Sequence, residues 1–337
     1  MKTTPHTIII AEAGVNHNGS LQRALEMVDC AARAGADYVK FQTFHTKSLV
    51  TSSAPKAEYQ KHNAPEGDTQ LSMLKALELS DTDFKALSDR CRERGIGFMS
   101  TPFDIEAADM LSSLDMDYWK IPSGEITNLP LLRHIGKMQE RVILSTGMCT
   151  LDEVDTAVNA LVEAGTPRRN IILLHCTTQY PAPAESVNLM AMNTLKTLGC
   201  HSVGYSDHTQ GISIPLAAVA LGASVIEKHF TLDRNLPGPD HRASIEPDEL
   251  KSMVDGIRQI EKALGSSDKF VTDAERPNIS IARKSIVAAR EIKAGEVFST
   301  DNLTTKRPGS GLSPMLWDSV IGTHATHDYL PDQQIDL

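Results

Sequence analysis

The sequence predicts an α/β protein, a (β/α)8 TIM barrel followed by a small β-rich domain, and three observations support this fold class. Eight short apolar runs alternate with segments in which apolar residues recur at helical spacing, as in parallel strands covered by helices. The chain has 337 residues, enough for a barrel of about 250 residues plus one small domain. Beyond Gly265 the alternation stops and turn-forming residues become frequent.

The expected strands are apolar or β-branched runs bounded by glycine, proline or polar residues. They are Thr7–Glu12, Tyr38–Thr43, Gly97–Phe103, Tyr118–Ser123, Val142–Gly147, Asn170–Thr177, Cys200–Tyr205 and Ala223–Ile226. An open doubly wound sheet has the same alternation of strands and helices. However, no G-x-G-x-x-G motif follows the first strand and the chain has no P-loop, so its usual nucleotide signatures are missing. We therefore favour the barrel.

Helical patterns follow these strands, and several begin at a good N-cap. Ser20 precedes a helix that runs to Gly35, and a second capped helix covers Ser80–Arg94. A capping-box pattern opens the helix Thr150–Gly165, and Pro247–Leu264 is expected to be the last barrel helix.

One connection is much longer than the others. Residues 44–79 are polar, contain Pro55 and Pro65, and hold a single short helical run near Leu71–Leu77. A connection of this length predicts either a lid over a site or a segment with a structure of its own.

The chain is expected to divide into three parts. Residues 1–265 form the barrel, residues 266–281 a polar linker, and residues 282–337 the second domain. The last part has short apolar runs around tight turns, such as Lys306–Gly311, and about fifty residues are too few for a robust independent core. We expect it to dock on a barrel.

The composition excludes several classes of protein. The net charge is −10 and no basic stripe is present, which argues against nucleic acid as a partner. The chain has neither a leader pattern nor an apolar run long enough for a bilayer, so we expect a cytoplasmic protein without a membrane partner. The five cysteines are scattered and lack C-x-x-C spacing, which argues against a disulfide framework or a zinc knuckle.

Two histidines mark the ends of the last two expected strands, in Gly204–His208 and Glu227–Thr231. The carboxyl ends of barrel strands carry the chemistry in this fold. Two neutral imidazoles with Asp207 and Glu227 beside them form a plausible divalent-metal site with open positions. The alternative is a pair of hydrogen-bonded core histidines, which is the more common role of a single histidine.

Other polar residues gather at the same strand ends. The full set is Glu12, Lys40, Gln42, Thr101, Lys120, Ser123, Ser145, His175, Ser206, Asp207, His208, Glu227 and His229. A single lysine at a strand end is usually a solvated rim residue, but two lysines with several hydroxyls at one barrel mouth suit phosphate and carboxylate groups. This composition predicts a small phosphorylated acid bound beside a metal.

Ten sequence blocks, taken in order, resemble the sialic acid synthase family. They are IIIAEAGVNHNGS, VKFQTF, STPFD, YWKIPSGE, LSTGM, LHCTTQYPAP, GYSDHT, IEKHFTLD, PGPDHRASIEPDEL and KRPGSG. This family combines a barrel with a C-terminal antifreeze-like (SAF, β-clip) domain. The chain looks most like the bacterial N-acetylneuraminate synthases; N,N'-diacetyllegionaminate synthases share nearly all these blocks, and pseudaminate synthases are more distant.

The resemblance implies a condensation reaction. The family joins C3 of phosphoenolpyruvate to the aldehyde carbon of an N-acetylated hexosamine, here expected to be N-acetylmannosamine. Water attacks C2, phosphate leaves by C–O cleavage, and N-acetylneuraminate is the product. His208 and His229 match the family's two metal ligands, most often for Mn²⁺, with Mg²⁺ or Co²⁺ also possible.

The resemblance also implies roles for individual residues. The phosphoenolpyruvate-binding positions are Lys40, Thr101, Lys120, Ser123, Ser145 and Ser206. The catalytic positions are Glu12, Lys40, Lys120 and Asp240, with Glu12 suited to handle a proton at C2. The sugar-binding positions are Gln42, Glu125, Tyr180, Asp240 and Arg307, and Glu227 is expected beside them.

Arg307 also leads to an expectation about how the subunits assemble. In the family this arginine contacts the N-acetyl group of the sugar from the other subunit, so the resemblance implies a domain-swapped homodimer. Without the resemblance, Arg307 beside Lys306 would be interpreted as a solvated turn arginine.

Two alternative functions stay open. An N,N'-diacetyllegionaminate synthase would act on 2,4-diacetamido-2,4,6-trideoxymannose, which carries a second acetamido group and lacks one hydroxyl. An apolar or roomier pocket wall would favour that substrate. A non-catalytic sugar-binding protein is the other alternative, and the presence of both histidines, both lysines, Glu12 and Arg307 argues against it.

Three nearby residues are not assigned to the reaction. His17 is interpreted as loop structure and Cys149 as a bystander, while the role of His241, adjacent to Asp240, stays open.

Overall fold

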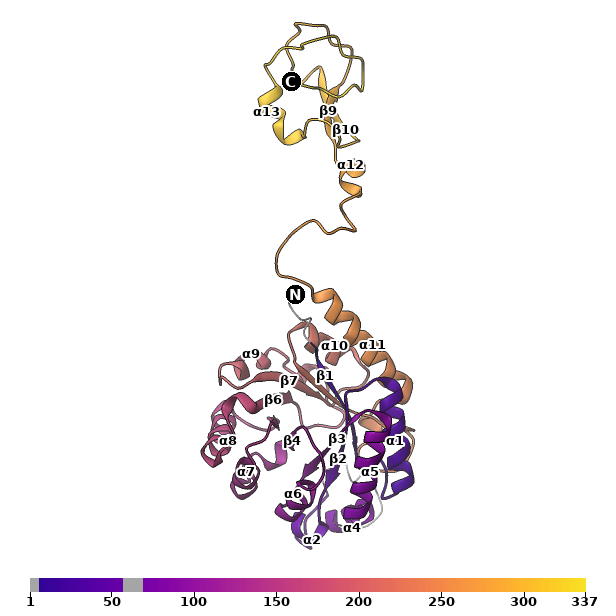
Figure 1. The fold of residues 1–337 in the computed structure, drawn as a ribbon, viewed down its shortest axis with the longest axis vertical. Helices are drawn as coiled ribbons and strands as arrows, with labels where there is room; N and C mark the ends of the chain where they lie inside the picture. The colour runs from indigo at the N-terminus through magenta and orange to yellow at the C-terminus, as the bar shows by residue number, and fades with distance from the viewer. Residues whose placement is uncertain (1–5, 57–68) are drawn as a thin grey trace. The chain divides into compact units, whose positions relative to one another are not determined.

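Two compact units make up the structure, a computed structural model that describes residues 6–56 and 69–337. The chain, drawn as a ribbon in Figure 1, divides after Gly265. Each unit has a hydrophobic core of its own. No helix in the described residues has the length and apolar character needed to cross a bilayer.

The first unit is a parallel barrel. Its strands are β1 (Ile8–Gly14), β2 (Tyr38–Thr43), β3 (Gly97–Pro102), β4 (Trp119–Ile121), β5 (Val142–Ser145), β6 (Ile171–Cys176), β7 (Ser202–Asp207) and β8 (Val225–His229). The hydrogen-bonded order is β3-β2-β1-β8-β7-β6-β5-β4, all parallel, and β3 also lies beside β4. The sheet therefore curls into a nearly closed barrel, which confirms the predicted fold over an open sheet.

Helices cover the outside of the barrel (Figure 1). They are α1 (Leu21–Ala34), α5 (Asp81–Arg94), α6 (Ile105–Leu111), α7 (Leu129–Gly136), α8 (Leu151–Ala164), α9 (Ala191–Lys196), α10 (Ser213–Ala220) and α11 (Pro247–Leu264). Ser20 caps α1 through the Arg23 N–H, and Ser80 and Thr150 form capping boxes on α5 and α8. These caps satisfy backbone donors that a helix start leaves unpaired, each worth about 1 kcal/mol. Short 3₁₀ turns, η1 (Ser123–Glu125), η2 (Arg168–Asn170), η3 (Ala184–Ser186) and η4 (His241–Ala243), complete the loops.

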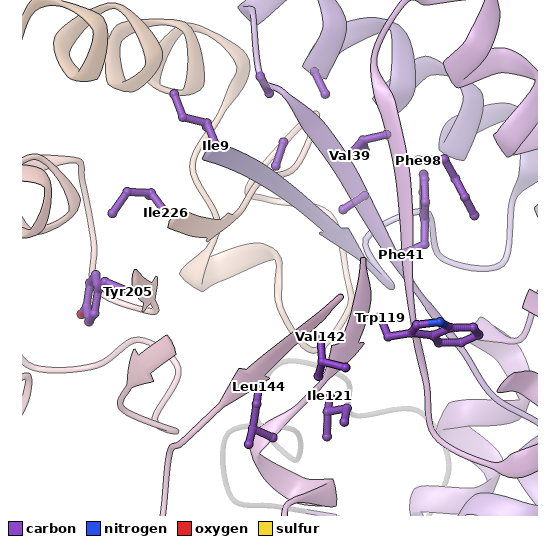
Figure 2. Close-up of a cluster of buried hydrophobic side chains, with 14 of the residues drawn as sticks. Ile9, Val39, Phe41, Phe98, Trp119, Ile121, Val142, Leu144, Tyr205 and Ile226 are labelled. Carbon is purple, nitrogen blue, oxygen red and sulfur yellow. The ribbon is translucent and has the colours of Figure 1, made fainter. Parts of the chain in front are cut away.

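The strands alternate between two buried layers, because successive side chains of a strand point to opposite faces. The outer layer, between strands and helices, includes Ile9, Val39, Phe41, Phe98, Trp119, Ile121, Val142, Leu144, Tyr205 and Ile226 (Figure 2). The inner layer fills the lumen with Ile10, Met99, Tyr118, Ile143, Ile172, Leu174 and Val225. The inward-facing residues become polar towards the C-terminal end of each strand. In β8, for example, apolar Val225 is followed on the same face by Glu227 and His229.

The long connection after β2 contains two helices within its described residues, α2 (Thr46–Leu49) and α4 (Gln70–Leu77). Helix α4 coincides with the predicted helical run, and residues 57–68 lie outside the described residues. Phe44, Met73 and Leu77 pack with Val15 into a small apolar cluster separate from the main core. The connection therefore has a core of its own beside the barrel.

The second unit is small and built around an antiparallel pair, β9 (Ser285–Ala288) and β10 (Leu303–Lys306). Helix α12 (Asn278–Ala282) lies where a linker was expected, and η5 (Pro314–Leu316) and α13 (Trp317–Val320) follow β10. Its core consists of Ile286, Ala288, Ile292, Phe298, Leu303, Val320, Ala325, Tyr329 and Ile335.

Candidate active site

A cavity of about 590 Å³ opens at the C-terminal ends of the barrel strands. Every barrel residue to which the family resemblance gave a role lines it: Glu12, Lys40, Gln42, Thr101, Lys120, Ser123, Glu125, Ser145, Tyr180, Ser206, His208, Glu227, His229 and Asp240. These residues come from all eight strands or the loops that follow them. The parallel barrel gathers them because all of its strands end at one face.

Two buried lysines form the floor of the cavity. Lys40 Nζ donates to Thr101 Oγ1 at 3.1 Å, and Lys120 Nζ donates to Ser145 Oγ at 2.8 Å. Both ammonium groups lie 3.6 Å from the Glu227 carboxylate, which they share. The arrangement holds two positive charges close together at the base of a cavity.

The pKa values of the two carboxyl groups in this cluster are shifted in opposite directions. Burial alone would raise the pKa of Glu227, but Lys120 and Lys40 outweigh it and hold that pKa at about 2. Glu12 Oε2 lies 2.6 Å from Lys40 Nζ, and Gln42 Nε2 donates to Glu12 Oε1 at 3.2 Å. Burial nevertheless raises the pKa of Glu12, because its desolvation exceeds the attraction of Lys40. Glu12 is therefore the carboxyl group of the floor that takes up a proton more readily.

The two histidines are buried, neutral and adjacent. Their ring centroids are 5.6 Å apart, and burial lowers the pKa of both imidazoles. His208 Nδ1–H donates to the Thr177 carbonyl at 2.6 Å, so the lone pair of this ring is on Nε2. His229 Nδ1 is buried and has no hydrogen-bond partner among the described residues; Asp240 Oδ2 lies 3.9 Å away. Neutral imidazoles with available nitrogens fit a divalent metal.

Side chains above the histidines complete the mouth of the site. The Tyr180 ring lies 4.2 Å from the His208 ring and makes an edge contact with His229 at 5.7 Å. Burial, with a smaller contribution from Glu12, raises the pKa of Asp240 to about 7.

Two serines and Glu125 also line the cavity. Ser206 Oγ donates to Glu227 Oε1 at 2.9 Å, and Ser123 Oγ accepts from the Gly147 N–H at 2.9 Å. Asn128 Nδ2 donates to Glu125 Oε2 at 2.6 Å, and burial raises the pKa of Glu125.

Asp207 does not belong to the cavity, so its assignment to the metal site is wrong. The alternation of β7 turns Ser206 into the lumen and Asp207 outwards, where it ion-pairs with the fully buried Lys228. Asp207 Oδ1 also accepts from the Tyr205 hydroxyl at 3.0 Å and the Thr209 N–H at 3.1 Å. The sequence analysis overlooked Lys228, although its place one residue after Glu227 already put it on the outer face.

Other histidines of this region also lie outside the cavity lining. His175 Nε2–H donates to the Val187 carbonyl at 2.6 Å. His241, whose role was open, is fully buried and bonded through both ring nitrogens, to Thr231 Oγ1 at 2.7 Å and Asn18 Oδ1 at 3.1 Å. These contacts give both histidines a structural role. His17 Nδ1 accepts from the Gly19 N–H at 3.1 Å, in line with its interpretation as loop structure.

The sequence analysis also missed an apolar wall. One side of the cavity is lined by Phe44, Leu49, Val50, Met73, Leu74, Leu77 and Phe103. Most of these residues belong to the long connection, whose polar composition concealed them, although the helical spacing around Leu71–Leu77 was the available signal. Met148, Cys176 and Thr178 line the cavity as well.

Arg307 belongs to the second unit, where it follows β10. Its side chain is exposed, and its Nε donates to the Ala282 carbonyl at 2.9 Å. Within the described residues its terminal Nη groups have no hydrogen-bond partner.

The fold and the cavity together define a TIM-barrel site in which two lysines and several hydroxyls face paired neutral histidines. The chain belongs to the NeuB family, the sialic acid synthase family that its motifs predicted; that family matches residues 27–269, and a SAF domain matches residues 283–336.

Three similar proteins show where the chain lies within this family. It is 53% identical to the N,N'-diacetyllegionaminic acid synthase of Campylobacter jejuni subsp. jejuni serotype O:2, with 98% of both chains covered. It is 50% identical to the protein of the same name from Legionella pneumophila subsp. pneumophila, with 94% of this chain and 89% of that protein covered. The crystal structure of an N-acetylneuraminic acid (sialic acid) synthetase from Leptospira borgpetersenii serovar Hardjo-bovis in complex with citrate is 37% identical, with a TM-score of 0.71 over 82% of this chain and 91% of that chain.

Proposed function

We propose that this chain is an N,N'-diacetyllegionaminate synthase. It condenses phosphoenolpyruvate with 2,4-diacetamido-2,4,6-trideoxymannose and water to give N,N'-diacetyllegionaminate and phosphate. N-acetylmannosamine was the first sugar that the motifs suggested. The sequence identity of 53% to a legionaminic acid synthase, against 37% to a sialic acid synthetase, favours the alternative. The observation that carries the chemistry is that the lysine pair and the histidine pair line one cavity.

The lysine floor binds phosphoenolpyruvate. The phosphate and carboxylate of phosphoenolpyruvate would replace the intramolecular partners of Lys40 and Lys120. The hydroxyls of Thr101, Ser123 and Ser145 would be further donors. Charge-assisted hydrogen bonds of this kind are about twice as strong as neutral ones, and burial of the floor excludes competing water.

His208 and His229 hold a divalent metal, for which Mn²⁺ is the expected ion. When bound there, the metal would supply Lewis-acid polarisation of the sugar aldehyde oxygen, where negative charge develops during bond formation. The Thr177 carbonyl keeps the His208 ring in the tautomer that leaves Nε2 free. Tyr180 packs against both rings and limits their rotation.

The reaction forms a bond between C3 of phosphoenolpyruvate and the aldehyde carbon. Water adds at C2, and the C2–O bond to phosphate breaks as C2 becomes a ketone. One water proton ends on the former aldehyde oxygen and the other on the departing phosphate, so atoms and charge balance. Glu12, between Lys40 and Gln42, is placed to relay the proton of the attacking water. Gln42, Glu125, Tyr180 and Asp240 contact the sugar.

The experiment that tests this function measures phosphate release. Release should require phosphoenolpyruvate, a divalent metal and sugar together, and it should be faster with the diacetamido sugar than with N-acetylmannosamine. A preference for N-acetylmannosamine would make the protein an N-acetylneuraminate synthase. No release with either sugar, despite binding of one of them, would support the non-catalytic alternative.

Arg307 completes the site of a second subunit in a domain-swapped homodimer. The exposed guanidinium, with unpaired Nη groups among the described residues, supports this assignment. If it donates to the acetamido carbonyl of the sugar, Arg307→Ala should weaken sugar binding by about 1.5–3 kcal/mol and leave phosphoenolpyruvate binding unchanged.

Subunit mixing tests the swap. His208→Ala is expected to be inactive, and Arg307→Ala is expected to have little activity at a sugar concentration well below its raised KM. A mixed swapped dimer has one site with both defects and one with neither. Activity should therefore reappear after subunit exchange. Exchange without recovery would show that Arg307 acts within its own chain or not at all.

A further inference from the structure

The cavity has two chemically different sides. The floor is polar, whereas the wall formed by Leu49, Val50, Met73 and Leu74 of the long connection, with Phe103 after β3, is apolar. Leu49, Leu74 and Phe103 are half-buried and pack against the small cluster beneath them. They therefore offer a firm apolar surface to the cavity.

The wall is held in place from behind. The Phe44 and Phe103 rings meet edge to face with centroids 6.4 Å apart, and Met73 is buried in the same cluster. Thr46 Oγ1 donates to Glu78 Oε2 at 2.5 Å and ties α2 to the end of α4. A capping box at Thr69 fixes the start of α4. A surface supported in this way can distinguish ligands by shape and polarity.

The wall and the histidines lie on opposite sides of β1. The wall follows β2 and β3, His208 follows β7, and His229 ends β8, in the strand order β3-β2-β1-β8-β7. A sugar whose aldehyde carbon lies at the histidines can therefore reach the wall with its far end across the mouth of β1. In an open-chain hexose that far end is C6.

We infer that the wall is the specificity surface for C6 of the substrate and that it receives a methyl group. This inference rests on the proposed function and identifies the residues that select a 6-deoxy sugar. A C6 hydroxyl would lose its water against Leu49, Val50 and Leu74 without gaining a partner. An apolar pocket discriminates against an added hydroxyl by about 10²-fold. Gln70, one helical turn before Leu74 on α4, is a polar residue that lines the cavity beside the wall.

The experiment compares two sugars that differ only at C6. They are 2,4-diacetamido-2,4,6-trideoxymannose and 2,4-diacetamido-2,4-dideoxymannose, each condensed with phosphoenolpyruvate by the full-length protein with Mn²⁺. Wild type should favour the 6-deoxy sugar by about 10²-fold in kcat/KM. Leu74→Asn should reduce that ratio to about tenfold or less, with the KM for phosphoenolpyruvate unchanged.

Two further variants make the result unambiguous. Leu71→Asn makes the same change on the same helix but outside the cavity lining, and it should keep the wild-type ratio. Val50→Thr adds a hydroxyl without changing side-chain shape, so it tests the wall even if Leu74→Asn fails to fold, and it should also lower the ratio. Unchanged ratios in the folded wall variants would overturn the inference while the proposed function stands. A wild type that condenses neither sugar would overturn the proposed function itself.

Discussion

Strands β7 and β8 carry two buried sets of polar side chains, offset by one residue, that have different roles. In the lumen, Ser206 and Glu227 belong to a cluster with Lys40 and Lys120 that faces the cavity. In the outer layer, Asp207 and Lys228 pair among the apolar residues between strands and helices.

The difference lies in how completely each group is satisfied from within the protein. Asp207 accepts from Tyr205, Thr209 and Lys228, and Lys228 also donates to the Thr209 carbonyl at 2.7 Å. In the lumen, Lys40 and Lys120 share Glu227 at 3.6 Å, and Glu227 Oε2 and His229 Nδ1 are buried without a hydrogen-bond partner among the described residues. A buried charge whose hydrogen bonds are all satisfied within the chain is structural, whereas a buried charged cluster that lines a cavity and keeps unpaired polar atoms is available to a ligand. The predictions below test this distinction.

The largest effect is expected at the metal ligands. His208→Ala or His229→Ala should lower turnover by about 10³-fold or more, because Lewis-acid polarisation is worth several kcal/mol. Calorimetric titration with Mn²⁺ should show weaker binding in both variants, and thermal unfolding should change little. His175→Gln, next to the site but outside its lining, is the matched control and should keep both metal binding and activity. Full turnover by either alanine variant would reject the assignment.

The outer pair should show the opposite behaviour. Lys228→Met leaves Asp207 buried without its counter-charge and should lower the free energy of unfolding by about 3–5 kcal/mol. The double variant Asp207→Leu/Lys228→Met should recover a large part of this loss, since an apolar pair of similar volume removes the desolvation cost. Urea titrations of the three proteins measure both effects. A Lys228→Met protein as stable as wild type would show that the pair contributes little.

Lysine substitutions in the lumen should reduce activity more than stability. Lys40→Met or Lys120→Met should raise the KM for phosphoenolpyruvate and lower kcat, a combined loss of about 1.5–3 kcal/mol in transition-state binding. The KM for the sugar should respond less. Lys75→Met, on the exposed side of α4, provides the control. If only the sugar KM changed, the lysines would belong to the other half of the site.

The smallest effect is expected in the pH dependence of stability, through the buried histidine His241. Burial lowers the pKa of His241 from 6.5 to about 4, so the unfolded chain binds its proton more readily between these values. Stability should therefore fall as the pH falls from 6.5 towards 4, and His241 should account for about 2 kcal/mol of the loss between pH 7 and pH 4.5. His241→Gln should show a correspondingly smaller loss in urea titrations at the two pH values. The exposed residue His201, changed to Gln, should behave like wild type.

Much of the fold could be predicted from the sequence because its signals are local. Apolar runs of strand length, helix caps such as Ser20 and Thr150, and the change of texture after Gly265 each depend on neighbouring residues. Most polar residues that line the cavity could also be predicted, since a parallel barrel brings every strand end to one face. Lys40 and His229, distant in sequence, both line the cavity for this reason.

What the sequence determined by itself is which residues end the strands, and with them the chemistry of the site. The tertiary structure decided which of those residues face the ligand. A one-residue step along a strand reverses the side-chain direction, so Ser206 and Glu227 face the lumen while Asp207 and Lys228 face the helices. The apolar wall was likewise decided in three dimensions, because Leu49, Leu74 and Phe103 become one surface only when α2, α4 and the loop after β3 pack on a shared cluster. Local sequence patterns determine which element a residue joins, whereas contacts between distant segments determine which neighbours it meets.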